Sequence, residues 1–193
     1  DTSQFEGFAW MDGIMDHQLE GIKFGAAAKR FVLGDEPGLG KTRQAIGYLD
    51  AVGCKKGILI APGEVAEQFA AELAELAEHR EIIDFRSVSP GIRTSRQQRL
   101  LASDNAIAVL NYEATRETST GLMGALLAWR ADTLVADEAH LFRNVDTAIF
   151  KHVQRLVGTD LYCGNCRREV SCLLRQEYTE AGKKKGPAVK VPC

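Results

Sequence analysis

The amino-acid sequence predicts an α/β fold in which a mainly parallel sheet is covered by helices on both faces. Short apolar runs at residues 31–33, 57–61, 106–110 and 133–136 indicate strands. The runs are continuous rather than alternating, as expected for strands that are buried on both faces. Helical patterns separate the runs, and strands that are connected through helices form parallel sheets. A shorter run, Ile82-Ile83, is a candidate fifth strand.

Three segments between these runs have helical patterns. Residues 41–51 follow a glycine-rich stretch, and residues 93–101 form a basic segment. Between them, Val65, Phe69, Leu73 and Leu76 recur at helical spacing. Because ligands of parallel α/β sheets gather at the carboxyl ends of the strands, motifs at those ends are the first candidates for a functional site.

The composition is typical of a globular protein and indicates no particular function. Its 193 residues are 45% hydrophobic and 26% charged, which suits one domain and a small appendage. There is no apolar run of about 18 residues that would span a membrane. The polar residues 1–4 argue against a secretory signal, so we expect an intracellular protein, cytoplasmic or nuclear. The net charge of -2 neither demands nor excludes a nucleic-acid partner.

The strongest motif is a phosphate-binding loop at residues 34–42, between an expected strand and an expected helix. Its glycines allow backbone N–H groups to face a phosphate, and the helix N-terminus adds positive potential. Lys41 is expected to reach the β- and γ-phosphates of a nucleotide, and the hydroxyl of Thr42 to bind Mg²⁺. The strict form of this motif has glycine at position 35, where this chain has Asp35.

A pair of carboxylates, Asp137 and Glu138, directly follows the run at 133–136. Such a pair after a strand is more often a solvated helix start, but its occurrence downstream of a phosphate loop favours catalysis. We expect Asp137 to hold Mg²⁺ and Glu138 to orient and deprotonate the attacking water.

Five segments, in order, resemble the Swi/Snf-type DNA translocases of helicase superfamily two. Residues 35–42 are close to the loop D-E-x-G-L-G-K-T, which has no glycine at its first position. Residues 17–21 resemble the adenine-recognising segment of these proteins. Residues 58–62 with 68–69, and residues 109–113, resemble two DNA-contacting motifs, and residues 137–144 resemble their DEAH-type box.

The resemblance implies a RecA-like first lobe that hydrolyses ATP while it grips DNA, with double-stranded DNA favoured over RNA. It implies catalytic roles for Lys41, Asp137, Glu138 and His140. The expected nucleotide contacts are Gln18, Glu36, Gly38, Leu39, Gly40, Lys41, Thr42 and Arg43. Two features depart from the family. The family's next motif is matched only weakly, by residues 155–160. The second lobe, which would supply catalytic arginines, is missing, so this lobe alone is expected to hydrolyse ATP slowly.

The composition changes near residue 158, and we expect a lobe at residues 1–158 and a cysteine-rich segment at 159–193. Cys163 and Cys166 have the spacing of a zinc pair. Cys172 and Cys193 are expected to complete a Zn²⁺ site; alternatively, Cys193 begins a second pair and Cys172 is a bystander. Free thiols are the competing interpretation. The basic residues of this segment, which contact phosphates or form a solvated loop, are Arg167, Arg168, Lys183, Lys184 and Lys185.

The leading hypothesis is therefore an ATP hydrolase, the first lobe of a DNA translocase or helicase with ATP and Mg²⁺ as ligands. One alternative is the motor subunit of a restriction or repair complex. Another is a DNA-binding or scaffolding module that uses the zinc segment. That last alternative is disfavoured because a protein that no longer hydrolyses ATP would be expected to have lost at least one catalytic residue. This chain keeps Lys41, Thr42, Asp137 and Glu138.

Overall fold

A computed structural model of the chain describes residues 5–28, 31–36, 38–86, 89–116, 121–138 and 147–157, and the backbone of two short strands, 174–175 and 189–190. The chain divides into two compact units, residues 1–152 and 153–193. The division falls inside the last helix, α7 (Ala148–Val157). The expected boundary near residue 158 stays a prediction.

The first unit contains a four-stranded sheet in the order β2-β3-β1-β4. Its strands are β1 (Lys56–Ala61), β2 (Glu81–Asp84), β3 (Ala106–Asn111) and β4 (Thr133–Ala136). All three pairings are parallel; Leu59 of β1, for example, lies between Val109 of β3 and Val135 of β4. The predicted parallel sheet is therefore confirmed, including the short strand at 82–83.

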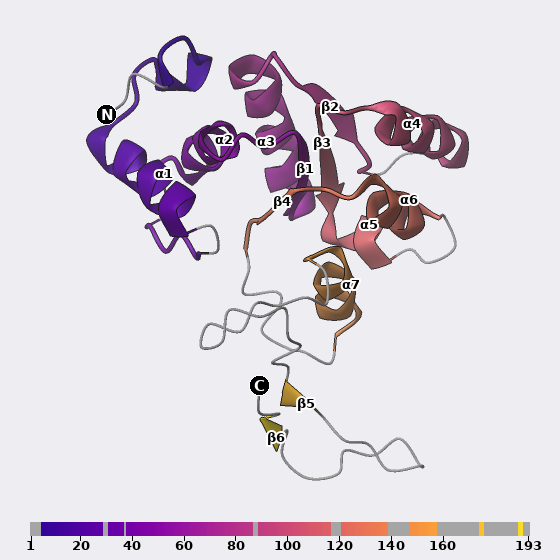
Figure 1. Ribbon diagram of the computed structural model, residues 1–193. Coiled ribbons are helices and arrows are strands. Elements are labelled where there is room, and N and C mark those ends of the chain that lie inside the picture. The colour runs from indigo at the N-terminus through magenta and orange to yellow at the C-terminus, as the bar shows by residue number, and fades with distance from the viewer. Residues whose placement is uncertain are drawn as a thin grey trace. The chain divides into compact units, whose positions relative to one another are not determined.

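Helices lie on both sides of this sheet, with α1 to α3 on one side and α4 to α6 on the other (Figure 1). A short 3₁₀ helix, η2 (Ala9–Met11), precedes them. The bounds are α1 (Asp16–Ala28), α2 (Lys41–Ala51), α3 (Gly63–Leu76), α4 (Pro90–Ala102), α5 (Tyr112–Arg116) and α6 (Leu122–Trp129). None of the described helices is long and apolar enough to cross a membrane.

The central strands carry the core of the first unit. Five of the six residues of β1 and five of the six of β3 are buried, which explains their continuous apolar runs. From the helices, Ile46 of α2 and Phe69 and Leu73 of α3 join the same apolar cluster. The helical spacing of Phe69 and Leu73 in the sequence corresponds to the face of α3 that packs inward.

The strand that we expected at residues 31–33 is not formed. These residues have no assigned secondary structure, and the side chain of Val32 is 83% exposed. Residues 31–33 line a cavity of about 430 Å³ together with Val135 and Ala136 of β4. In the described sheet β4 pairs with β1, and residues 31–33 form no strand beside it.

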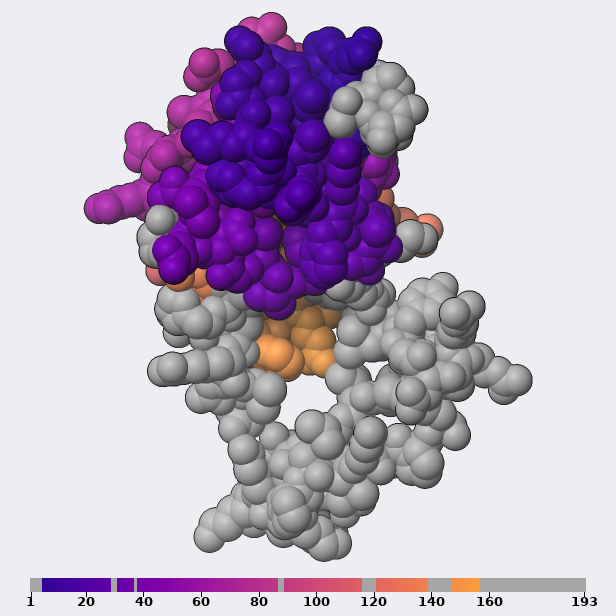
Figure 2. All heavy atoms as spheres, turned by 90° about the vertical axis from the view of Figure 1, so that its left-hand side faces the viewer, coloured from indigo at the N-terminus to yellow at the C-terminus, as the bar shows by residue number. Residues whose placement is uncertain are grey.

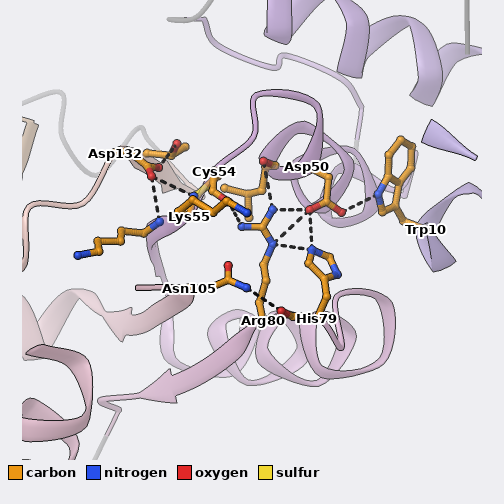
Figure 3. Close-up of polar contacts among 11 residues, drawn as sticks. Trp10, Asp50, Cys54, Lys55, His79, Arg80, Asn105 and Asp132 are labelled. Atoms are coloured by element: carbon orange, nitrogen blue, oxygen red, sulfur yellow. Dashed lines mark hydrogen bonds and ion pairs between the residues drawn. The ribbon is translucent and has the colours of Figure 1, made fainter. Parts of the chain in front are cut away.

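The N-terminal elements form a continuous surface on one face of the first unit (Figure 2). They are held together by a polar and ionic group that we call the Asp50 cluster, namely Trp10, Asp50, His79 and Arg80, in which Asp50 and Arg80 are buried and His79 is exposed (Figure 3). The indole Nε1 of Trp10 donates to Oδ2 of Asp50 at 2.8 Å. Arg80 donates to Oδ1 of Asp50 and to the carbonyl of Cys54, and His79 Nε2 lies 3.0 Å from Oδ1. The cluster joins η2, the end of α2 and the approach to β2.

Beyond the described part of α7, the second unit contributes one antiparallel pair, β5 (Leu174–Arg175) with β6 (Val189–Lys190). The four cysteines expected to bind zinc, Cys163, Cys166, Cys172 and Cys193, lie outside the described residues. Cys54, in the first unit, is a buried free thiol, and its burial raises its pKa to about 12. It therefore stays protonated and unreactive near neutral pH.

Candidate functional site

The phosphate loop is shaped by two glycines in the left-handed backbone region, Gly38 (φ 88°) and Gly40 (φ 72°). Gly40 is the cap residue of α2, whose first residues are Lys41 and Thr42. Left-handed conformations are open to glycine because it has no Cβ. The loop thus turns sharply into the N-terminus of α2, where the free N–H groups of the first turn attract anions.

Lys41 is folded back over its own loop. Its Nζ donates to the carbonyl oxygens of Asp35 at 2.9 Å and Glu36 at 3.1 Å. These two acceptors hold the ammonium group at the loop and leave one of its three N–H donors for another acceptor. A phosphate oxygen placed in the loop is a suitable third partner.

Asp35, the departure from the strict loop pattern, has a defined structural role. Its Oδ2 accepts a 2.7 Å hydrogen bond from Nε2 of Gln44, whose side chain is almost completely buried in α2. The side chain at this position therefore fastens the loop to the helix that follows it. Sequence reasoning missed Gln44, because only the fold brings it beside Asp35.

Gln18 lies beside the loop rather than free in the solvent. Its Nε2 donates to the carbonyl of Leu39 at 3.2 Å, and its Oε1 accepts from the N–H of Met15 at 3.1 Å. A glutamine amide has two N–H donors and two lone pairs, so one of each is left for the edge of a base. His17 Nε2 also lies 3.2 Å from the carbonyl of Leu39.

The remaining expected nucleotide contacts are on the same loop and helix. Nη1 of Arg43 donates to the carbonyl of Asp12 at 3.0 Å, which joins α2 to the segment before α1. Glu36 and Gly38 are exposed, and the side chain of Leu39 is 40% exposed.

The acidic pair forms a tight turn at the carboxyl end of β4. The N–H of Asp137 donates to the carbonyl of Ile60 at 2.9 Å, which continues the pairing with β1. The N–H of Glu138 then donates to Oδ1 of Asp137 at 2.8 Å. The backbone of Glu138 is left-handed (φ 53°), which is uncommon for a residue with a side chain.

Two cavities bring these segments together. A cavity of about 470 Å³ is lined by Gln18, Lys41, Thr42, Arg43 and Asp137, along with residues of the loop and of α3. The cavity of about 430 Å³ is lined by Lys41, Thr42, Asp137 and Glu138. The loop lysine, a hydroxyl and two carboxylates therefore line one continuous region. Their individual roles remain predictions.

Other expected residues are placed differently or fall outside the description. Phe69, in the segment that resembles a DNA-contacting motif, is buried in the core, whereas Gln68 lines the larger cavity. His140 lies outside the described residues. Within the described ranges, no group of three or more His, Cys, Asp or Glu side chains is arranged to hold a metal ion.

Tyr112, which the sequence placed only in the segment that resembles a DNA-contacting motif, also contacts the acidic pair. Its hydroxyl donates to the backbone carbonyl of Asp137, although the two residues lie 25 positions apart. The sequence signal was its place directly after the run that became β3, since residues at the carboxyl ends of neighbouring parallel strands meet at one edge of the sheet.

Fold and site together define a class: a parallel α/β lobe with a phosphate loop opposite an acidic pair. Comparison with known families makes this specific. The model of the SNF2-related domain family matches residues 5–163, and the chain belongs to this family.

Curated relatives are about one quarter identical to the chain. Switch 2 from Arabidopsis thaliana is 25% identical over 157 residues, which are 72% of this chain and 17% of the relative. The transcription regulatory protein SNF2 from Saccharomyces cerevisiae is 26% identical, over 76% of this chain and 8% of its own length. The DNA repair protein rhp54 from Schizosaccharomyces pombe is 26% identical, over 74% and 20%. The chain thus spans at most a fifth of these relatives.

A solved structure has the same fold. The SWI2/SNF2 ATPase core of Sulfolobus solfataricus, in complex with dsDNA, aligns with a TM-score of 0.56 and 23% identity. The alignment covers 72% of this chain and 28% of that one.

Proposed function

We propose that this chain is the nucleotide-binding first lobe of an ATP-dependent DNA translocase. The observation that carries the proposal is the cavity shared by Lys41, Thr42, Asp137 and Glu138. Membership of the SNF2-related domain family supports it. The finer roles below rest on the chemistry of these side chains.

The phosphates of ATP are proposed to lie in the loop at Gly38 to Thr42. Lys41 neutralises phosphate charge, and the N–H groups at the start of α2 donate to phosphate oxygens. Glu36, Leu39 and Arg43 border the bound nucleotide. The free N–H and lone pair of Gln18 are suited to the adenine edge.

The residues present also fit a magnesium ion, because the hydroxyl of Thr42 and the carboxylate of Asp137 line the same cavity and oxygen is the preferred ligand of Mg²⁺. The ion, when bound, would neutralise charge that develops on the phosphates. Glu138 is proposed to accept the proton of the attacking water. His140 is assigned to coupling with DNA contact on the resemblance alone.

Double-stranded DNA is the proposed partner, with a second lobe in the whole protein. A solved structure of the same fold is described with dsDNA, and a repair protein and a transcription regulator are among the relatives. Such a protein works inside the cell. Since the chain aligns with 28% of that solved ATPase core, we expect full turnover to require groups outside this chain.

A zinc ribbon at residues 159–193 is proposed from the spacing of Cys163 and Cys166, with Cys172 and Cys193 as the remaining ligands. We assign it a structural role, separate from the lobe at residues 1–158. Its lysines and arginines are candidates for phosphate contacts.

The test is ATP hydrolysis by the full-length protein, with and without double-stranded DNA. We expect strong stimulation by DNA in the wild type. Lys41→Ala and Glu138→Gln should each lower kcat by at least about 100-fold, because each removes a group that acts on the reacting phosphate or water. Kinetics should be compared at one fixed salt concentration, since DNA binding weakens as salt rises.

Matched controls are Lys55→Ala and Glu75→Gln, which make the same changes at exposed positions outside both cavities. Both should retain wild-type rates. Retained turnover in Lys41→Ala or Glu138→Gln would contradict the assigned roles. Binding of DNA without any hydrolysis by the wild type would instead favour a DNA-binding or scaffolding module.

A further inference from the structure

Tyr112 connects two strand ends at the candidate site. It follows β3 directly and opens α5, and its side chain is buried. Its hydroxyl donates to the backbone carbonyl of Asp137, the first residue after β4. β1 lies between β3 and β4 in the sheet, so this hydrogen bond reaches across the end of β1.

The base of Tyr112 is itself held in place. Oδ1 of Asn111 accepts from the N–H of Ala114 at 2.9 Å, and the hydroxyl of Thr115 donates to the carbonyl of Tyr112 at 2.7 Å. These bonds close the turn from β3 into α5. The phenol therefore extends from a turn that is itself hydrogen-bonded.

The peptide that Tyr112 contacts is the one whose conformation needs support. The carbonyl of Asp137 belongs to the peptide bond between Asp137 and Glu138, and Glu138 has a left-handed backbone. This conformation carries a steric cost for any residue with a Cβ and persists only where neighbouring contacts stabilise it. A hydrogen bond to that carbonyl fixes the orientation of the peptide plane.

We propose that Tyr112 is a positioning residue that holds the Asp137–Glu138 turn, and with it the Glu138 carboxylate, in the orientation required for hydrolysis. The proposal rests on the proposed function for the reaction itself. Tyr112 does not contact the reacting atoms; it acts through the backbone of the turn. Without the Tyr112 hydroxyl, the peptide keeps the hydrogen bond from the Glu138 N–H to Oδ1 of Asp137 but loses the one at its carbonyl, so it is held less firmly and the carboxylate spends less time in the productive position.

The hydroxyl is a dependable donor over the working pH range. A tyrosine hydroxyl ordinarily has a pKa of about 10, so it carries its proton at neutral pH. The phenol therefore stays protonated, and donates, well beyond neutral pH. Phenylalanine keeps the ring and removes only this donor, so Tyr112→Phe is the direct variant.

The first measurement is independent of catalysis: hydrogen exchange of individual backbone amides in the full-length protein without nucleotide. In Tyr112→Phe, we expect the amide of Glu138, which donates to Oδ1 of Asp137, to exchange about tenfold faster. The amide of Asp137, which is bonded to Ile60, should keep its protection and serves as an internal reference. Tyr48→Phe makes the same chemical change in α2 and should leave both amides unchanged.

The second measurement is steady-state hydrolysis by the same variants. Tyr112→Phe should lower kcat by about tenfold with little change in KM, because the turn and not the nucleotide loop is altered. In a Glu138→Asp background, the loss caused by Tyr112→Phe should be smaller, since both changes act on one carboxylate. A merely structural tyrosine would give equal losses in both backgrounds.

The outcomes separate the two proposals. Unchanged exchange of the Glu138 amide in Tyr112→Phe would overturn the positioning role, whatever the rates. Faster exchange with unchanged kcat would overturn its importance for hydrolysis. A wild-type protein that does not hydrolyse ATP would contradict the proposed function and limit Tyr112 to holding the turn.

Discussion

Gly40 is a residue at which one added methyl group should disturb the site directly. Its backbone is left-handed (φ 72°), and a Cβ at this position would collide with Nε2 of Gln18. The absence of a side chain therefore serves two purposes: it permits the turn into α2, and it allows Gln18 to pack on the loop.

We predict that Gly40→Ala weakens ATP binding at least tenfold, because the loop must either strain or expel Gln18. Fluorescence titration of the full-length protein with an ATP analogue measures this. Gly124→Ala is the matched control: Gly124 lies inside α6, has open space around its Cα and has no left-handed backbone. It should bind normally and be more stable by about 0.5–1 kcal/mol. Equal binding by both variants would contradict the role of Gly40.

Asp35 is a second residue whose side chain shapes the phosphate loop, although it departs from the strict motif. The letters alone show a missing glycine at this position, which the resemblance to Swi/Snf-type loops accounts for. The structure adds the reason: the carboxylate at position 35 bonds to Gln44. A side chain that fastens the loop thus occupies a position where other loops use conformational freedom.

At the scale of elements, α2 has a functional end and an anchored end. Its N-terminus carries Lys41 and Thr42, and near its C-terminus Asp50 is the acceptor of the Asp50 cluster (Figure 3). The side chains of Asp50 and Arg80 are only 1% and 4% exposed. A buried ion pair contributes little net stability, but removal of one partner leaves an uncompensated charge.

We therefore predict that Arg80→Met lowers the free energy of unfolding by about 3–5 kcal/mol, because Asp50 stays buried without its main counter-ion. Urea denaturation measures the change. Arg99→Met removes a partner from the exposed pair with Glu81, whose side chains are 56% and 34% exposed, and should cost less than about 1 kcal/mol. If the two variants lose equal stability, the Asp50 cluster is not the anchor that its burial indicates.

At the scale of the whole molecule, the two units are expected to respond differently to zinc. The cysteines at 163, 166, 172 and 193 all belong to the second unit. The described residues of the first unit contain no group of metal-binding side chains of this kind.

We predict one zinc ion per chain in the purified full-length protein, measured by elemental mass spectrometry. A zinc-selective chelator should increase proteolysis within residues 159–193, because structural zinc sites lose their fold without metal. Protease resistance of the first unit should not change. Cys163→Ser should reproduce the effect of the chelator, whereas Cys54→Ser should retain full zinc content. Protein without zinc would leave the free-thiol interpretation.

Much of this architecture could be predicted because it follows from residue patterns that are local in the sequence. The runs that became β1 and β3 are apolar because these central parallel strands are covered on both faces, and the shorter run that became β4, at the end of the described sheet order, is only partly buried. The phosphate loop and the acidic pair are contiguous in sequence, so their residue types and order were readable directly. Residues 31–33 were wrongly predicted as a strand because pairing depends on a neighbour at the correct distance, which no local pattern specifies.

By itself, the sequence determined the α/β class, the order of the motifs and the side chains available for nucleotide chemistry, because these depend on residue type and spacing along the chain. Only the tertiary structure decided which distant side chains support them. Contacts between separate segments show this. Gln44 bonds to Asp35, Asp50 bonds to Trp10 and Arg80, and Tyr112 donates to the carbonyl of Asp137. Such contacts depend on how helices and strand ends meet in space, and the sheet brings them together only once its order, β2-β3-β1-β4, is established.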